Sequence, residues 1–145
     1  MIELDCIDER WIAQLLALYG TAWWSAGHTI DDVRSLLAHS DLVTGLVDEV
    51  ADRLVAFARV LTDRTYFAMI FDVIVTPEKR GTGLGAEVMK RVLARPELHD
   101  VRSIELVCQP DLIGFYEQFG FSTDIGTSLL MRRTSDPRLG GAGPR

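Results

Sequence analysis

Three glycines at alternate positions, Gly81, Gly83 and Gly85, form the stretch of this sequence best suited to bind a ligand. They stand between a β-branched apolar stretch typical of a strand and a segment whose apolar residues recur at helical spacing. The first turn of a helix presents backbone N–H groups without partners, at the positive end of the helix dipole. Without side chains in the way, a phosphate can approach that backbone closely, and Arg80 adds positive charge. The spacing therefore predicts a pyrophosphate-binding loop.

Two common phosphate-binding loops do not fit the spacing of these glycines. A dinucleotide fingerprint needs G-x-G-x-x-G, whereas this chain has G-x-G-x-G. The phosphate loop of NTPases needs a Lys-Ser or Lys-Thr pair after its last glycine, and here Ala86 and Glu87 follow. A third interpretation stays open at this point: a glycine-rich turn that only lets the strand and the helix pack closely.

The loop resembles the acyl-CoA loop of the GNAT superfamily of N-acetyltransferases, and a second motif supports the resemblance. The family's loop reads Gln or Arg, two residues, Gly, one residue, then Gly or Ala. The chain matches it with Arg80-Gly81-Thr82-Gly83-Leu84-Gly85, and it matches the family's V-x-V strand ending with Val73-Ile74-Val75. The family's late helix reads F-Y-E-x-x-G-F, and residues 115–121 match every fixed position. The resemblance covers about residues 1–134.

The resemblance implies acetyl-CoA (coenzyme A) as co-substrate. Its pyrophosphate is expected on the amides from Gly81 to Ala86, and its pantetheine arm along the preceding strand. The implied cofactor-binding residues are Val73, Ile74, Val75, Arg80, Gly81, Thr82, Gly83, Leu84, Gly85 and Ala86.

Two residues are candidates for proton transfer. By resemblance, Tyr116 of the second motif is the general acid that protonates the leaving thiolate; the alternative is a tyrosine of an amphipathic core stripe. Asp72 is the one acid on the strand before the loop, on the opposite face from Val73 and Val75. It is a candidate general base, or else a strand-end carboxylate that accepts backbone hydrogen bonds. The amine can also lose its proton to bulk water.

Aromatic residues mark the side on which family members bind the acceptor. Trp23, Trp24 and His28 lie in a predicted loop, and Tyr66 and Phe67 begin the central strand. A wall of aromatic rings can receive an apolar group, or a cation through the π-face. The sequence therefore predicts Trp23, Trp24, His28 and Phe67 as substrate-binding residues. The alternative is that both indoles fill the core between helices.

The elements that position these residues follow from hydrophobic periodicity and capping signals. The expected fold is α/β (α+β): a mixed, mostly antiparallel sheet with flanking helices, in the element order of the GNAT fold. Strands are expected over 1–6, 42–47, 54–61, 66–75, 104–108 and 128–133. Helices are expected after Asp8 as N-cap, after a capping box of Thr29 and Asp32, from Leu84, and from Asp111 to a left-handed cap at Gly120. Residues 1–134 are one domain, and the Gly-, Pro- and Arg-rich residues 135–145 are predicted to be a disordered tail.

Composition bears on the partners, the location and the metal content of this protein. The net charge of −6 over 145 residues argues against nucleic acid or an anionic membrane as partner. No apolar run reaches membrane-spanning length, and no signal peptide is visible, which favours a cytoplasmic location. Cys6 and Cys108 are expected as two small buried thiols, with Cys6 on the buried face of the first strand. No metal-ligand spacing occurs among the histidines and cysteines, so no metal is expected.

The predicted function is N-acetyltransfer from acetyl-CoA to a primary amine of a small-molecule acceptor, by direct attack on the thioester. The alternative is a non-catalytic acyl-CoA-binding sensor or interaction module. The resemblance also leaves room for a homodimer.

Overall fold

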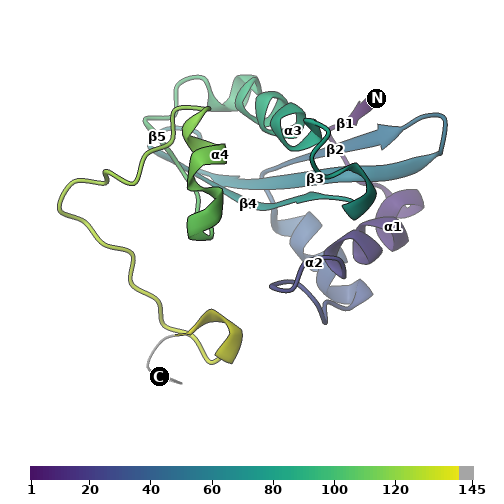
Figure 1. The fold of residues 1–145 in the computed structure, drawn as a ribbon, viewed down its shortest axis with the longest axis horizontal. Coiled ribbons are helices and arrows are strands. Elements are labelled where there is room, and N and C mark those ends of the chain that lie inside the picture. The colour runs from purple at the N-terminus through teal and green to yellow at the C-terminus, as the bar shows by residue number, and fades with distance from the viewer. Residues whose placement is uncertain (141–145) are drawn as a thin grey trace. The chain divides into compact units, whose positions relative to one another are not determined.

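The chain builds a five-stranded sheet in which the strands follow one another in sequence order, β1-β2-β3-β4-β5. Neighbouring strands are antiparallel from β1 to β4, whereas β5 runs parallel to β4 (Figure 1). The computed structural model describes residues 1–140, which form two compact units, residues 1–108 and residues 109–140. The strands are β1 (Ile2–Leu4), β2 (Leu42–Asp48), β3 (Arg53–Thr62), β4 (Phe67–Val75) and β5 (Ser103–Glu105).

Helices cover both faces of this sheet: α1 and α2 lie on one face and α3 on the other (Figure 1). Asp8 caps α1 by accepting from the Arg10 amide at 3.1 Å, and Thr29 and Asp32 form the predicted capping box of α2. Each cap satisfies orphan N–H groups and fixes where its helix begins. The helices of this unit are α1 (Glu9–Tyr19), α2 (Ile30–His39) and α3 (Leu84–Leu93).

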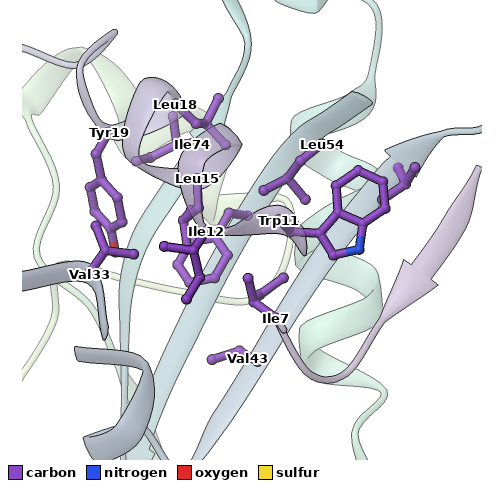
Figure 2. Packing of buried hydrophobic residues seen from close by; sticks show 12 residues of the cluster. Ile7, Trp11, Ile12, Leu15, Leu18, Tyr19, Val33, Val43, Leu54 and Ile74 are labelled. Carbon is purple, nitrogen blue, oxygen red and sulfur yellow. The ribbon is translucent and has the colours of Figure 1, made fainter. Parts of the chain in front are cut away.

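The main core lies between α1, α2 and the sheet. Leu15, Tyr19, Val33 and Phe57 are completely buried there. Figure 2 shows Leu15, Tyr19 and Val33 with neighbouring side chains of this cluster. The apolar stripe that the sequence predicts for α1 is therefore the face that anchors this helix on β3 and β4.

Strand β4 contains a bulge that the periodicity of the sequence does not reveal. Phe57 of β3 pairs with Ile74, but Arg59 pairs with Phe71, so β4 has one residue more than β3 across this interval. Within the bulge, Asp72 adopts a left-handed backbone with φ 58°. Asp tolerates this conformation better than most residues, yet it still costs on the order of 1 kcal/mol. The surroundings of Asp72 must therefore hold it there.

The sheet opens beyond the middle of β4. Its pairing with β5 ends at Met69 and Glu105, while its pairing with β3 continues to Val75. Within residues 1–108, the opposite edge of β4 therefore has no strand partner from Ile70 onward. This free edge belongs to the strand along which the resemblance places the pantetheine arm.

The unit 109–140 is mostly irregular. A 3-10 turn, Pro110–Leu112, runs into the short helix α4 (Ile113–Glu117), and Gly120 follows with φ 91° in the predicted left-handed conformation. A further 3-10 turn spans Pro137–Leu139 inside the predicted tail, and residues 141–145 of that tail lie outside the described residues.

Three sequence predictions about strands are wrong. The strand expected over 104–108 is β5, which ends at Glu105. Residues 128–133 form no strand within 109–140, because an extended segment becomes a strand only by bonding to a neighbour; Leu129 and Met131 are almost fully exposed. The first strand is shorter than expected, and Ile2 and Cys6 are exposed rather than facing the core. Cys108 is half-buried, so the expectation of two buried thiols also fails.

Candidate active site

The glycine loop joins β4 to α3 and has the backbone that the glycines permit. A 3-10 turn, Pro77–Lys79, leads into it. Gly81 and Gly83 have φ angles of 76° and 87°, a region that side chains disfavour, and Gly83 is the N-cap of α3. A Cβ atom placed on either glycine would have no neighbour within 4 Å. The space over the loop is therefore open to a ligand rather than filled by packing.

The amides of this loop are available to such a ligand. Within residues 1–140, no hydrogen bond is formed by the N–H groups from Gly81 to Ala86, and the first bond of α3 runs from the Glu87 amide to the Gly83 carbonyl at 3.1 Å. Six consecutive amides at the start of a ten-residue helix form a site suited to an anion.

Two cations beside the loop have different surroundings. Lys79 forms an ion pair with Asp48 at 3.0 Å, so its charge is already compensated. Arg80 donates from Nε to the Val75 carbonyl at 3.1 Å and from a terminal nitrogen to Thr21 Oγ at 3.4 Å. Arg80 therefore connects the glycine loop to the end of β4 and to the loop after α1. Because no carboxylate pairs with it in the described residues, its charge can interact with a phosphate.

The carboxylate of Asp72 joins α1 to the bulge of β4. The hydroxyl of Tyr19 donates to Asp72 Oδ2 at 2.6 Å, and Arg59 Nε donates to the same oxygen at 2.5 Å. The Arg59 guanidinium also lies over the ring of Phe71, 4.9 Å from its centroid. The partners of Asp72 are thus side chains of α1 and β3, and they hold the strained backbone of the bulge.

Burial and this contact both change the acidity of Tyr19. Its side chain is fully buried, and burial followed by the negative charge of Asp72 raises the pKa of Tyr19 far above its ordinary value. Tyr19 is therefore a permanent hydrogen-bond donor to Asp72 over the whole physiological pH range.

The role of Asp72 as general base stays a prediction, and its contacts bear on it directly. The side chains of Asp72 and Arg59 are only 14% and 19% exposed, and their ion pair favours the charged carboxylate. A proton taken up by this carboxylate would break the ion pair and leave a half-buried guanidinium without its partner. The arrangement suits a structural anchor of the bulge better than a proton acceptor.

The aromatic residues predicted to bind the acceptor divide into two groups. Trp23 is 58% exposed in the loop after α1, whereas Trp24 packs partly buried against the core cluster, as the core interpretation of the indoles predicts. Phe67 is 39% exposed at the start of β4. Within residues 1–140, no ring contact joins Phe67 to either tryptophan.

His28 is linked to Asp72 through Tyr19. Its ring stacks on Tyr19, with centroids 4.7 Å apart and planes 10° from parallel. Its Nδ1 lies 2.7 Å from the Ser25 carbonyl oxygen. His28, Tyr19 and Asp72 thus form a continuous row from the loop after α1 to the bulge of β4.

Tyr116 belongs to the unit 109–140, in α4. Its side chain is buried, and its ring makes edge contacts with Phe115 at 4.9 Å and Phe121 at 6.1 Å between centroids. These contacts keep the predicted motif together locally. Its role as general acid stays a prediction.

Sequence reasoning missed Tyr19, Arg59 and Ser25 as parts of this site. Tyr19 is visible only as the last member of an apolar stripe, and Arg59 as one polar residue in an apolar strand. The one available signal is Asp72 itself, because an isolated acid in a buried strand needs a partner.

Neither a metal site nor a membrane-spanning helix is found in the described part of the chain. Residues 1–140 contain no group of three potential ligands that could hold a metal ion. Among these residues, no helix is both long enough and apolar enough to span a bilayer.

Comparison with known proteins gives a consistent result. A model of the family described as acetyltransferase (GNAT) matches residues 10–121. Two relatives each align over 94 residues, 63% of this chain: the uncharacterized N-acetyltransferase ycf52 of Porphyra purpurea at 35% identity, and the chloroplastic serotonin N-acetyltransferase 2 of Oryza sativa at 38%. The alignments cover 54% and 47% of those proteins, so the chain spans about half their length.

A solved structure extends the likeness over nearly the whole chain. A protein of Xanthomonas campestris assigned to the GNAT family is 32% identical, with a TM-score of 0.75. The match covers 92% of this chain and 94% of that one. The expectation of a cytoplasmic location stays a prediction.

The open glycine loop leads to a test with a matched pair of variants. Asn and Asp both tolerate the left-handed backbone of Gly83, have nearly the same size and enter open space. We expect Gly83→Asp to weaken acetyl-CoA binding by at least about 10-fold more than Gly83→Asn, because only the carboxylate repels a pyrophosphate. Isothermal titration with CoA measures this, with the melting temperatures as control. Equal affinities in the two folded variants would remove the loop from the phosphate site.

Proposed function

Because this chain belongs to the GNAT family of acetyltransferases, we propose that it transfers the acetyl group of acetyl-CoA to the primary amine of a small molecule with an aromatic body. The observation that carries the proposal is the row of free amides from Gly81 to Ala86 beside a strand whose neighbouring edge is open. An acyl-CoA needs both features, one for its pyrophosphate and one for its pantetheine amides.

Each of these two features binds a different part of the cofactor. The pyrophosphate lies on the amides at the start of α3, where Arg80 adds charge. The pantetheine arm runs along the free edge of β4 at Val73–Val75, where its amides bond to the backbone as an added strand would. The thioester then reaches toward the bulge at Asp72, at the other end of that edge.

The reaction is a direct acyl transfer, in which the protein forms no covalent bond to either substrate. The amine nitrogen attacks the thioester carbonyl carbon, the tetrahedral intermediate collapses, and the carbon–sulfur bond breaks. Tyr116 donates a proton to the departing thiolate. Holding amine and thioester in line contributes roughly 7–11 kcal/mol of the barrier reduction available to such a reaction.

The choice of an aromatic amine rests on Trp23 and on one relative. The exposed indole of Trp23, in the same loop as His28, offers its face to an apolar ring or to an ammonium group. The name of the rice relative specifies serotonin, which joins a primary amine to an indole. The net charge of −6 favours a cationic acceptor at long range, although salt screens this effect.

The second candidate is a module that binds acyl-CoA without turnover. This module would use the same glycine loop and the same open strand edge, so acyl-CoA binding alone does not distinguish it from the enzyme. Turnover does, and the position of Tyr116 within an intact motif favours the enzyme.

The acceptor class can be tested by following CoA release with a panel of amines. We expect aromatic ethylamines such as serotonin and tryptamine to have higher kcat/KM than spermidine, free amino acids or a lysine-containing peptide. We expect Trp23→Ala to raise KM for the best aromatic amine roughly 2- to 13-fold, as loss of one ring contact predicts. Val50→Ala is the matched control, since Val50 is fully exposed in the turn between β2 and β3.

Two results would contradict this acceptor class. One is a preference for the peptide over every small amine. The other is an unchanged KM in Trp23→Ala together with a large fall in melting temperature, which would make Trp23 a structural residue.

The role of Tyr116 is tested by removing one oxygen. We expect Tyr116→Phe to lower kcat by about 10²–10⁴ with little change in acetyl-CoA affinity, because general acid catalysis acts in the transition state. Single-turnover kinetics ensures that chemistry is the step observed. A wild-type rate in this variant would leave Tyr116 as a packing residue.

A further inference from the structure

The loop between α1 and α2 holds the ring of His28 in one orientation. Ser25 is completely buried, and its hydroxyl donates to the Tyr19 carbonyl at 2.6 Å. The Ser25 carbonyl in turn lies 2.7 Å from His28 Nδ1. Together with the stack on Tyr19, these contacts fix both the plane of the imidazole and the direction of its two nitrogens.

The contact with Ser25 also determines which nitrogen carries the proton. A carbonyl oxygen can only accept a hydrogen bond, so Nδ1 must be the donor. In the neutral ring the hydrogen then resides on Nδ1, and Nε2 keeps an unprotonated lone pair. Within residues 1–140, no hydrogen bond engages Nε2, and the side chain is half-buried rather than covered.

A proton acceptor is needed at this place, and Asp72 is poorly suited to the role. Most amines are protonated at neutral pH and must lose a proton before or during attack. The carboxylate of Asp72 already accepts hydrogen bonds from Tyr19 and Arg59 at Oδ2. The imidazole of His28 stands at the open end of the same row of side chains and has a free acceptor.

We propose that Nε2 of His28 is the catalytic base that accepts the proton of the acceptor amine, an inference that rests on the proposed acetyltransferase function. Nε2 takes a proton from the bound ammonium group, which frees the nitrogen lone pair to attack the thioester carbonyl carbon. The nitrogen of the tetrahedral intermediate then gives up its second proton to solvent. The carbon–sulfur bond then breaks, and the thiolate takes a proton from the general acid. His28 returns its own proton to solvent after product release.

The groups that face His28 stabilise the imidazolium formed in this step. The Ser25 carbonyl keeps its bond to Nδ1–H, and the π-face of Tyr19 lies against the ring. Asp32, in the first turn of α2, has its pKa lowered by its hydrogen bonds with Thr29 and, to a smaller extent, by the charge of His28. Beyond Tyr19, Asp72 and Arg59 form a pair of opposite charges.

Two substitutions distinguish the effect of losing the Nε2 lone pair from the effect of changing how the ring packs. His28→Asn keeps an N–H donor for the Ser25 carbonyl but has no equivalent of Nε2. His28→Phe keeps the stack on Tyr19 and loses both nitrogens. We expect each variant to lower kcat at about pH 7 by roughly 10²–10³, as for loss of a general base, with KM for acetyl-CoA unchanged.

The pH dependence of the rate distinguishes a catalytic role from a structural one, because a purely structural residue would not change its shape. In both variants only amine that is already deprotonated reacts, so their rate should rise about 10-fold per pH unit and approach the wild-type rate near the pKa of the amine. A wild-type kcat and a wild-type acidic limb in His28→Asn would overturn the proposal. A loss in His28→Asn that His28→Phe restores would also overturn it, because packing would then be the cause.

A measurement on the unliganded protein tests the tautomer without any reaction. Two-dimensional ¹⁵N–¹H NMR of the histidine ring should show Nδ1 protonated and Nε2 unprotonated; the opposite tautomer overturns the proposal. Failure of the proposed function is recognised separately, since it appears in the wild type as binding of acetyl-CoA with no amine acetylated. That result would overturn both inferences, whereas failure of the His28 proposal alone appears only in the variants of an active enzyme.

Discussion

The interaction on which the rest of this structure depends is the one at Asp72 Oδ2, which receives hydrogen bonds from the Tyr19 hydroxyl and from Arg59 Nε. It holds a non-glycine residue at φ 58° within the paired region of β3 and β4. The same contact fixes the end of α1 on β4. A bulge held in this way lets β4 stay paired with β3 to Val75 while its other edge leaves β5 after Met69.

The two halves of the candidate site meet through the segment that follows α1. On the cofactor side, Arg80 connects the glycine loop to Thr21 and to the last carbonyl of β4. On the acceptor side, His28 stacks on Tyr19, which is bonded to Asp72. In the proposed reaction, substrate positioning therefore depends on residues 19–28 as much as on the motif that marks the family. The helix caps at Asp8 and Thr29 contribute by fixing where the helices on either side of that segment begin.

Local signals explain what the sequence predicted correctly, and long-range pairing explains what it did not. The capping box at Thr29 and the left-handed cap at Gly120 depend on neighbouring residues alone, so their residue types reveal them. The bulge at Asp72 depends on register against β3, which no residue of β4 specifies by itself. The same limit explains the missing strand at 128–133, whose apolar residues are those of a strand but which has no partner within 109–140. It also explains Tyr19, whose place in an apolar stripe hides the polar end of its side chain.

The ionisation of Tyr19 tests this account most directly. A buried hydroxyl that donates to a carboxylate keeps its proton in the folded state, while the unfolded chain releases it near its ordinary pKa of about 10. The unfolded state then binds fewer protons, so this group lowers the free energy of unfolding by up to about 1.4 kcal/mol per pH unit above about pH 10. Tyrosinate absorbance of the folded protein should therefore be the same in wild type and Tyr19→Phe up to the onset of alkaline unfolding, and the unfolded wild type should show one tyrosine more. Ionisation of Tyr19 near its ordinary pKa in the folded protein would contradict the central role given to its bond with Asp72.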